Sequence, residues 1–213
     1  MKKVAYDEMF NNEMSHGWYL GTRWLLLKIM KKMLHQNAKL LDLGCGTGGT
    51  IAHLKKNKFN NVYGIDNSKY AISLCKKRKI KNVQFGDVNK LPFEDNTFEA
   101  VICLDVLYHK GVSLKKALKE IKRILKKDGI FYSQEPAYRW LKSKHDEAIE
   151  TGERFTKEEL SKAFAEAGLK KIKSSYFNTF FAPPIIISRF KNKLIRASNS
   201  ESDVAKLATL VNS

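Results

Sequence analysis

The stretch Leu40-Leu41-Asp42-Leu43-Gly44-Cys45-Gly46-Thr47-Gly48-Gly49 decides the fold of this chain. Its first four residues are typical of the end of a buried strand, and the glycines that follow predict a turn in which the backbone approaches a ligand closely. Ile51, Ala52 and Leu54 come next at helical spacing. A strand, a glycine turn and a helix N-terminus together predict a nucleotide site at the carboxyl edge of a parallel sheet.

The rest of the chain alternates between strand and helix patterns. We expect strands at about 39–43, 62–66, 82–85, 98–104, 130–132 and 171–177. We expect helices at about 24–34, 49–56, 68–75, 114–125 and 156–167. This alternation predicts a Rossmann-like, doubly wound α/β fold with a mostly parallel sheet and helices on both faces. We divide the chain into a helical lead-in or lid (1–37), the main domain (38–180) and a basic amphipathic segment (181–213).

Length and composition narrow the class of protein. With 213 residues the chain is long enough for one domain with a substantial core. No apolar run approaches the roughly 20 residues that span a bilayer, and the start of the chain is no signal peptide. The three cysteines are odd in number and lie within expected elements or the glycine turn, which favours reduced thiols and a cytoplasmic protein. No cluster of Cys and His has the spacing of metal ligands, so we expect no metal.

The net charge of +17 raises the question of a nucleic-acid partner. The basic residues are mostly lysines on the outer faces of expected helices, which is the pattern of a solvated surface. Charge of this kind supports only non-specific attraction to nucleic acid. We therefore favour a small-molecule acceptor and keep an RNA acceptor as a variant, which would require a basic face around the ligand site.

The residues around the glycines distinguish between two nucleotide ligands. Gly44, Gly46 and Gly49 match the dinucleotide fingerprint, and Asp66 follows at the end of the second strand, where a carboxylate accepts both ribose hydroxyls. Asp42, however, would repel a pyrophosphate at close range. A ligand with an ammonium and a sulfonium, such as S-adenosylmethionine, would instead be attracted. Asp87, after the third strand, is placed to accept a hydrogen bond from an adenine amino group.

These segments together resemble the class I S-adenosylmethionine-dependent methyltransferases, in particular those with a methyltransferase type 11-like domain. The resemblance covers about residues 38–180. It rests on the motif at 40–49, on Asp66, on Gly86-Asp87, on 91–99 (LPFEDNTFE), on 98–109 and on 123–129 (RILKKDG). Glu99 replaces the aspartate that is usual in the LPF stretch.

The flanking segments are similar to a narrower, uncharacterised bacterial-type subgroup. Its N-terminal pattern is present here as Glu13, His16, Gly17, Trp18, Tyr19 and Arg23. Its later patterns are present as Pro136, Ala137, Trp140, Ser143, His145, Asp146, Arg154, Phe155, Thr156, Tyr176, Phe177 and Asn178. Thr151 stands where a histidine of this pattern is expected.

The resemblance implies S-adenosylmethionine as the cofactor. It assigns cofactor binding to Asp42, Gly44, Cys45, Gly46, Asp66, Asn67, Asp87, Val88 and Leu104. In this assignment the first turn surrounds the methionine part, Asp66 holds the ribose and Asp87 holds the adenine. The residues after the fourth strand, from Leu104 to His109, line the sulfonium and the acceptor entrance.

Methyl transfer from a sulfonium needs a general base only for a poorly ionised acceptor. His109 is a candidate base because it follows the fourth strand at the mouth of the site. His145, with Asp146 beside it, is a second candidate, although adjacent side chains rarely face each other. Glu135 ends the fifth strand and is a candidate for contact with the acceptor. Arg139 and Arg154 are candidates to bind an anionic acceptor.

Two features of the C-terminal part leave alternatives open. The segment 176–196 is rich in Phe, Ile and basic residues, which suits contact with a membrane surface or a lipid-like acceptor, although we slightly favour a dimer or lid surface. No pattern for the seventh, antiparallel strand of the fold is found, so we expect a truncated form.

The competing functions are an NAD-dependent oxidoreductase and a non-catalytic protein that binds S-adenosylmethionine. The sequence does not name the acceptor or the oligomeric state.

Overall fold

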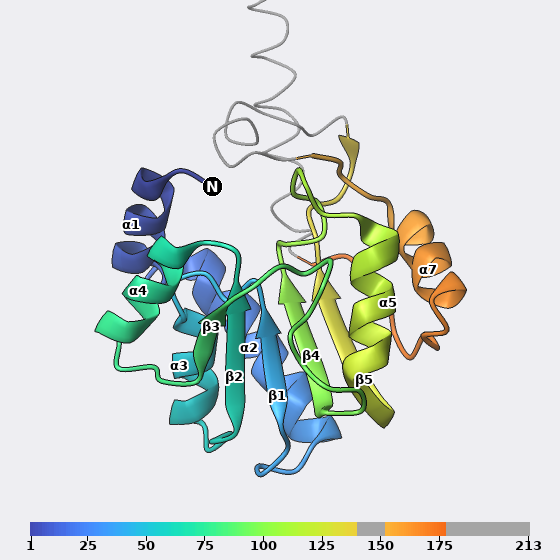
Figure 1. Ribbon diagram of the computed structural model, residues 1–213, viewed down its shortest axis with the longest axis horizontal. Helices are drawn as coiled ribbons and strands as arrows, with labels where there is room; N and C mark the ends of the chain where they lie inside the picture. Colours follow the sequence, from blue (N-terminus) through green and yellow to red (C-terminus); the bar gives the residue numbers. More distant parts are fainter. Residues whose placement is uncertain (140–151, 178–213) are drawn as a thin grey trace, which may run out of the picture. The chain divides into compact units, whose positions relative to one another are not determined.

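The computed structural model describes residues 1–139 and 152–177. Within Met1–Ile172, five parallel strands form one sheet in the order β3-β2-β1-β4-β5 (Figure 1). The strands are β1 (Leu40–Leu43), β2 (Val62–Asp66), β3 (Val83–Phe85), β4 (Phe98–Leu104) and β5 (Leu125–Gln134). The helices are α1 (Lys3–Asn12), α2 (Gly17–Met33), α3 (Gly49–Lys56), α4 (Lys69–Lys77), α5 (Leu114–Ile124) and α7 (Lys157–Glu166). The expected α/β class with helices around a parallel sheet is confirmed.

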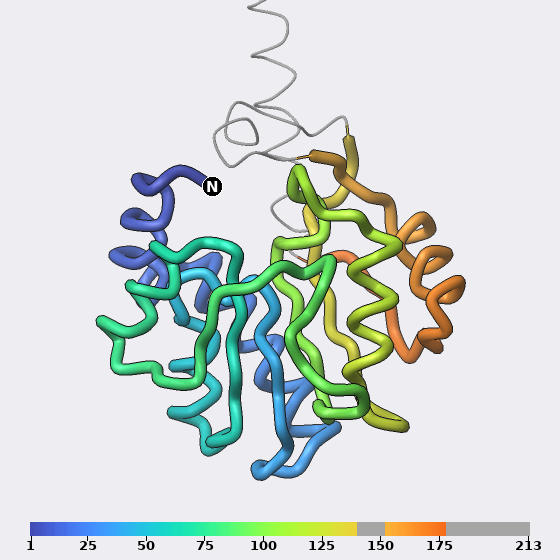
Figure 2. Tube along the Cα trace, viewed as in Figure 1, coloured from blue at the N-terminus to red at the C-terminus, as the bar shows by residue number. Residues whose placement is uncertain are grey.

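Helices cover both faces of the sheet. On one face, α2 and α3 contribute Leu26, Met30, Ile51 and Leu54 to a core that includes Leu40 of β1. On the other face, α5 packs against the strand side chains that point away from the first core, and α7 contributes Phe164. The central strands are thus buried on both sides, which explains their nearly continuous apolar sequence. α1 packs against α4, and the trace in Figure 2 shows the two helices side by side.

Local sequence signals place most element boundaries. The side chain of Ser68 accepts a hydrogen bond from the Ala71 N–H and so caps α4. Thr156 and Glu159 form a capping box at the start of α7, and Gly168 adopts the left-handed φ of +76° just after that helix. These signals are reliable because they satisfy the N–H and C=O groups that a helix end leaves unpaired.

The fifth strand begins earlier than the sequence predicted. The fifth strand was expected at 130–132, but α5 ends at Ile124 and residues 125–129 already belong to β5. Asp128 has φ of +61°, and the pairing with β4 shifts register between Phe98 and Ala100. A bulge therefore absorbs the turn-forming residues within the strand.

The N-terminal and C-terminal parts also differ from expectation. The expected helix at 24–34 is the second half of a longer helix, and α1 was not predicted at all. The predicted strand at 171–177 is wrong, since those residues lie in no strand and Ile172 is exposed. Its Lys- and Ser-rich sequence offers a sheet few apolar side chains to bury. Residues 178–213, including the whole of the expected basic segment (181–213), lie outside the described part of the chain.

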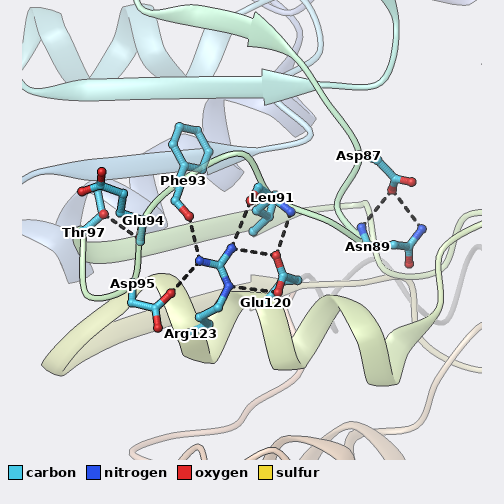
Figure 3. Close-up of polar contacts among 9 residues, drawn as sticks. All are labelled: Asp87, Asn89, Leu91, Phe93, Glu94, Asp95, Thr97, Glu120 and Arg123. Carbon is cyan, nitrogen blue, oxygen red and sulfur yellow. Dashed lines mark hydrogen bonds and ion pairs between the residues drawn. The ribbon is translucent and has the colours of Figure 1, made fainter.

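Arg123 of α5 braces the loop between β3 and β4 (Figure 3). Its guanidinium donates to the carbonyls of Phe93 and Leu91 at 2.7 and 3.0 Å. It also binds the carboxylates of Asp95 and Glu120, each at 2.8 Å. These contacts account physically for two of the family-like segments, 91–99 and 123–129, which meet here. Their role is to hold a loop whose backbone has no strand partners.

We predict that Arg123→Gln lowers the free energy of unfolding by about 1–2 kcal/mol, because several charge-assisted hydrogen bonds are lost at a partly exposed site. Urea denaturation followed by circular dichroism measures this change. The neighbouring Lys122→Gln, which removes an exposed charge from the same helix, is the matched control. Equal denaturation midpoints for the two variants would show that Arg123 does not brace the loop.

Candidate cofactor site at the carboxyl edge of the sheet

The glycine turn joins β1 to α3 in the predicted way. Gly44, Gly46 and Gly48 all have positive φ, between 52° and 87°. The N–H groups of Gly44 and Cys45 donate to the Ile65 carbonyl at 2.8 and 3.0 Å, which ties the turn to the end of β2. A Cβ on Gly44 would collide with Val106, so the turn lies directly against the loop that follows β4. Only glycine fits this position without strain.

Asp66 connects three segments at the end of β2. Its Oδ2 accepts from the Gly46 N–H at 2.9 Å. Its Oδ1 accepts from the Ser68 N–H at 2.9 Å and from the Tyr6 hydroxyl at 3.3 Å. Burial raises the pKa of this carboxyl, and the two N–H groups and the tyrosine partly offset that effect. The carboxylate thus lies beside the glycine turn, where the sequence placed a ribose acceptor.

Asp87 lies just beyond β3 and forms a local turn (Figure 3). Its Oδ1 accepts from the backbone N–H of Asn89 at 2.8 Å and from the Asn89 side chain at 2.9 Å. The Asn89 side chain also contacts Gly111 and Ser113, on the chain between β4 and α5. The carboxyl group is exposed, and one oxygen is held in the turn. Asn67 directly follows β2 and Asp87 lies just beyond β3, and both residues are exposed, whereas Val88 is half-buried.

A buried ion-pair cluster around Glu13 fixes the glycine turn from the other side. Glu13, after α1, accepts a hydrogen bond from the Thr47 hydroxyl and forms an ion pair with Arg78 at 2.9 Å. Arg23 of α2 donates to the Glu13 carbonyl. Burial raises the pKa of Glu13, while Thr47 and the two arginines lower it. The cluster therefore couples α1, α2 and α4 to the turn, and it explains why Glu13 and Arg23 stand out in the N-terminal pattern.

Asp42 is a buried carboxyl with one unpaired oxygen in the described part of the chain. Its side chain is 2% exposed, and Oδ2 has no hydrogen-bond partner among the described residues. Burial, reinforced by the charges of Glu13 and Asp66, raises its pKa to about 8. A buried carboxylate is costly unless a cation or donors compensate it. The position beside the glycine turn therefore suits a ligand that carries positive charge.

Two more carboxyl groups follow the neighbouring strands. Asp105, directly after β4, has φ of +58°, and burial raises its pKa to about 6 against the opposing effect of Arg154. Burial and the charge of Asp105 raise the pKa of Glu135 to about 8. Oε1 of Glu135 accepts from the Leu107 N–H at 3.2 Å, so this residue anchors the loop after β4. Its Oε2 has no partner in the described part of the chain.

The predicted general bases have different outcomes. His109 lies on the loop after β4, partly exposed, with its ring stacked on the buried Tyr108 at 4.4 Å between centroids. Glu135 lies close to that loop, as its bond to Leu107 shows. His145, Asp146 and Trp140 fall outside the described residues. Arg139 forms ion pairs with Glu153 and Glu159, and Arg154 donates to the Ala137 carbonyl.

The structure therefore brings together most of the predicted cofactor residues. The glycine turn (Gly44, Cys45 and Gly46) is hydrogen-bonded to the end of β2, including Asp66, while Asp42 lies in β1 just before the turn and Leu104 ends the adjacent β4. Sequence reasoning missed Tyr6 and gave Glu13 no role, because α1 carries no glycine or strand signal. Among the described residues, no group of three His, Cys, Asp or Glu side chains could hold a metal ion, and no helix could span a membrane.

We predict that Asp42→Asn stabilises the protein when no ligand is present, and more so at pH 8 than at pH 5. The folded-state pKa is raised to about 8, above the unfolded value, so the native state binds the extra proton. Stability of the wild type therefore falls as the pH rises between about 4 and 8. The gain at pH 8 should be at least about 1 kcal/mol. Thermal melts across this pH range measure it, and a gain independent of pH would contradict the account.

Comparisons with known proteins agree with this site. Residues 41–133 match the model of the methyltransferase domain family. A sterol 24-C-methyltransferase, ERG6B, of Gibberella zeae is 37% identical over 148 residues, which cover 65% of this chain and 35% of that protein. The chain spans about 29–45% of the length of the first curated relatives it matches.

Solved structures share the fold. A Haloferax volcanii protein solved in complex with the methyltransferase activator Trm112 aligns with a TM-score of 0.62 and 24% identity, covering 76% of this chain and 75% of that one. The PH0226 protein of Pyrococcus horikoshii aligns with a TM-score of 0.50 and 34% identity, covering 59% and 61%. Residues 41–133 therefore match a methyltransferase domain, and the fold is that of the class I S-adenosylmethionine-dependent methyltransferases.

Proposed function

We propose that the protein transfers a methyl group from S-adenosylmethionine to a small-molecule acceptor. The observation that carries the proposal is the buried carboxyl of Asp42, which has no described partner on Oδ2 and lies in the strand that leads into the glycine turn. S-adenosylmethionine has an ammonium and a sulfonium, which favour the ionised form of this carboxyl, and it lacks a pyrophosphate, which would disfavour it. When bound, the cofactor supplies an activated methyl group.

The chain's own residues would bind and align the reactants. Asp66 would accept hydrogen bonds from the ribose, and Asp87 from the adenine amino group. Asp42 with the glycine turn would surround the methionine part. The loop after β4, anchored by Glu135, would form the acceptor side. Because the methyl group is already activated, alignment and exclusion of water are the main contributions that the protein has to make.

The charge at the edge of the sheet favours a small, non-anionic acceptor over a nucleic acid. Asp42, Asp66, Asp87, Asp105 and Glu135 all lie at or just after strand ends on this edge. The exposed carboxylate of Asp87 would repel a polyanion at this edge. The curated relatives named as sterol 24-C-methyltransferases make a sterol-like acceptor one candidate.

Three further roles remain proposals. His109 is the candidate general base with a described position beside the loop after β4, and His145 is a second candidate. Contact of residues 181–213 with a membrane or a lipid-like acceptor is proposed from sequence alone. The alternative is a protein that binds the cofactor without catalysing methyl transfer. Measured turnover would exclude this alternative. No comparison supports the oxidoreductase alternative.

Isothermal titration with S-adenosylhomocysteine, with NADH in parallel, tests the proposal. We predict micromolar binding of S-adenosylhomocysteine and none of NADH. Asp66→Ala should weaken that binding by about 1–3 kcal/mol, because ribose hydroxyls lose a charged acceptor. Glu94→Ala, an exposed acidic residue on the braced loop, serves as the control and should bind as the wild type does. Binding of NADH instead, or full affinity in Asp66→Ala, would contradict the proposed function.

A further inference from the structure

α1 lies directly on the cofactor side of the glycine turn. Tyr6 is 6% exposed and contacts Asp66 through its hydroxyl group. Met9, one helical turn later, places its sulfur 2.9 Å from where a Cβ of Gly46 would stand. The residues that should receive the ribose are therefore covered by a helix that the sequence did not predict.

The hydrogen bonds of Asp66 leave too little room for a ribose. A carboxylate offers about four acceptor sites, two on each oxygen. Oδ1 already accepts from the Ser68 N–H and the Tyr6 hydroxyl, and Oδ2 accepts from the Gly46 N–H. A single site is left, on Oδ2, whereas a ribose diol held by both oxygens needs one site on each. The Ser68 and Gly46 bonds are part of the turns themselves, so the tyrosine hydroxyl is the donor that can leave.

We propose that the Tyr6 hydroxyl occupies the place of a ribose hydroxyl on Asp66, and that cofactor binding displaces it. This inference rests on the proposed function, since it takes the ribose of S-adenosylmethionine as the competitor. Tyr6 is then a positioning residue that sets cofactor affinity. Its hydroxyl group donates a hydrogen bond to the buried carboxylate when the site is empty. Because this bond must break on binding, it lowers the affinity for the cofactor.

The two ends of α1 are held differently, which allows such a displacement. The C-terminal end is fixed by the buried Glu13 cluster and by Arg78, which donates to the Phe10 carbonyl at 2.6 Å. Nearer the N-terminus, Asp7 accepts from the Tyr70 hydroxyl at 2.5 Å, and Lys3 lies over the Tyr70 ring. Tyr70 is partly exposed. The displacement therefore requires movement of the Tyr6 side chain alone, while Glu13 keeps its contacts with the glycine turn.

The test is titration of Tyr6→Phe with S-adenosylhomocysteine. Phenylalanine keeps the packing of the ring and frees an acceptor site on Asp66, so the variant should bind about three- to tenfold more tightly than the wild type. Tyr70→Phe removes another tyrosine hydroxyl from the α1–α4 interface without touching Asp66, and its affinity should stay within about twofold. Melting temperatures establish that both variants are folded.

A second pair of probes makes the test specific to the ribose. Adenosine should gain affinity from Tyr6→Phe, and 2′,3′-dideoxyadenosine, which lacks both hydroxyls, should not. Equal or weaker binding of S-adenosylhomocysteine by Tyr6→Phe, or an equal gain for both nucleosides, would overturn this inference and leave the proposed function standing. Failure of the wild type to bind S-adenosylhomocysteine would overturn both.

Discussion

The hydrogen bonds of Asp66 are the constraint on which the rest of the site depends. One carboxylate joins the turn after β1, the start of α4 and the N-terminal helix, through Gly46, Ser68 and Tyr6. Parallel pairing of β1 with β2 brings these segments to the same edge of the sheet. The position of α1 follows from this arrangement, because Tyr6 can reach Asp66 only when the helix lies across the glycine turn.

The second constraint is the burial of acidic side chains at the carboxyl edge of the sheet. Asp42, Asp105 and Glu135 all have raised pKa values, in each case chiefly because burial disfavours the charged form. A fold selected for stability alone would avoid such groups. Their concentration at the carboxyl ends of β1, β4 and β5 is typical of a functional site. It also distinguishes this edge from the lysine-rich helix surfaces that produce the net charge of +17.

The sequence predicted the central part of the fold well and its periphery poorly. The glycine turn, the buried strands and the capping residues have local signatures, because each follows from backbone geometry or from strict burial. The bulge at Asp128 depends on pairing with β4, which no local pattern reveals. The strand expected at 171–177 had some alternation but few apolar residues. For the site, Asp42 and Asp66 were predictable from the motif, whereas the contacts of Tyr6 and Glu13 arise from tertiary packing of a helix without a motif.

The most direct test of the central claim is the number of protons released when S-adenosylmethionine binds. In this account, the carboxyl of Asp42 is largely protonated in the free protein at pH 7. It should lose this proton when the positively charged cofactor binds beside it. Calorimetric titrations in buffers of different ionisation enthalpy should then show proton release by the wild type and markedly less by Asp42→Asn. Binding without proton release, or the same release in both proteins, would contradict the account.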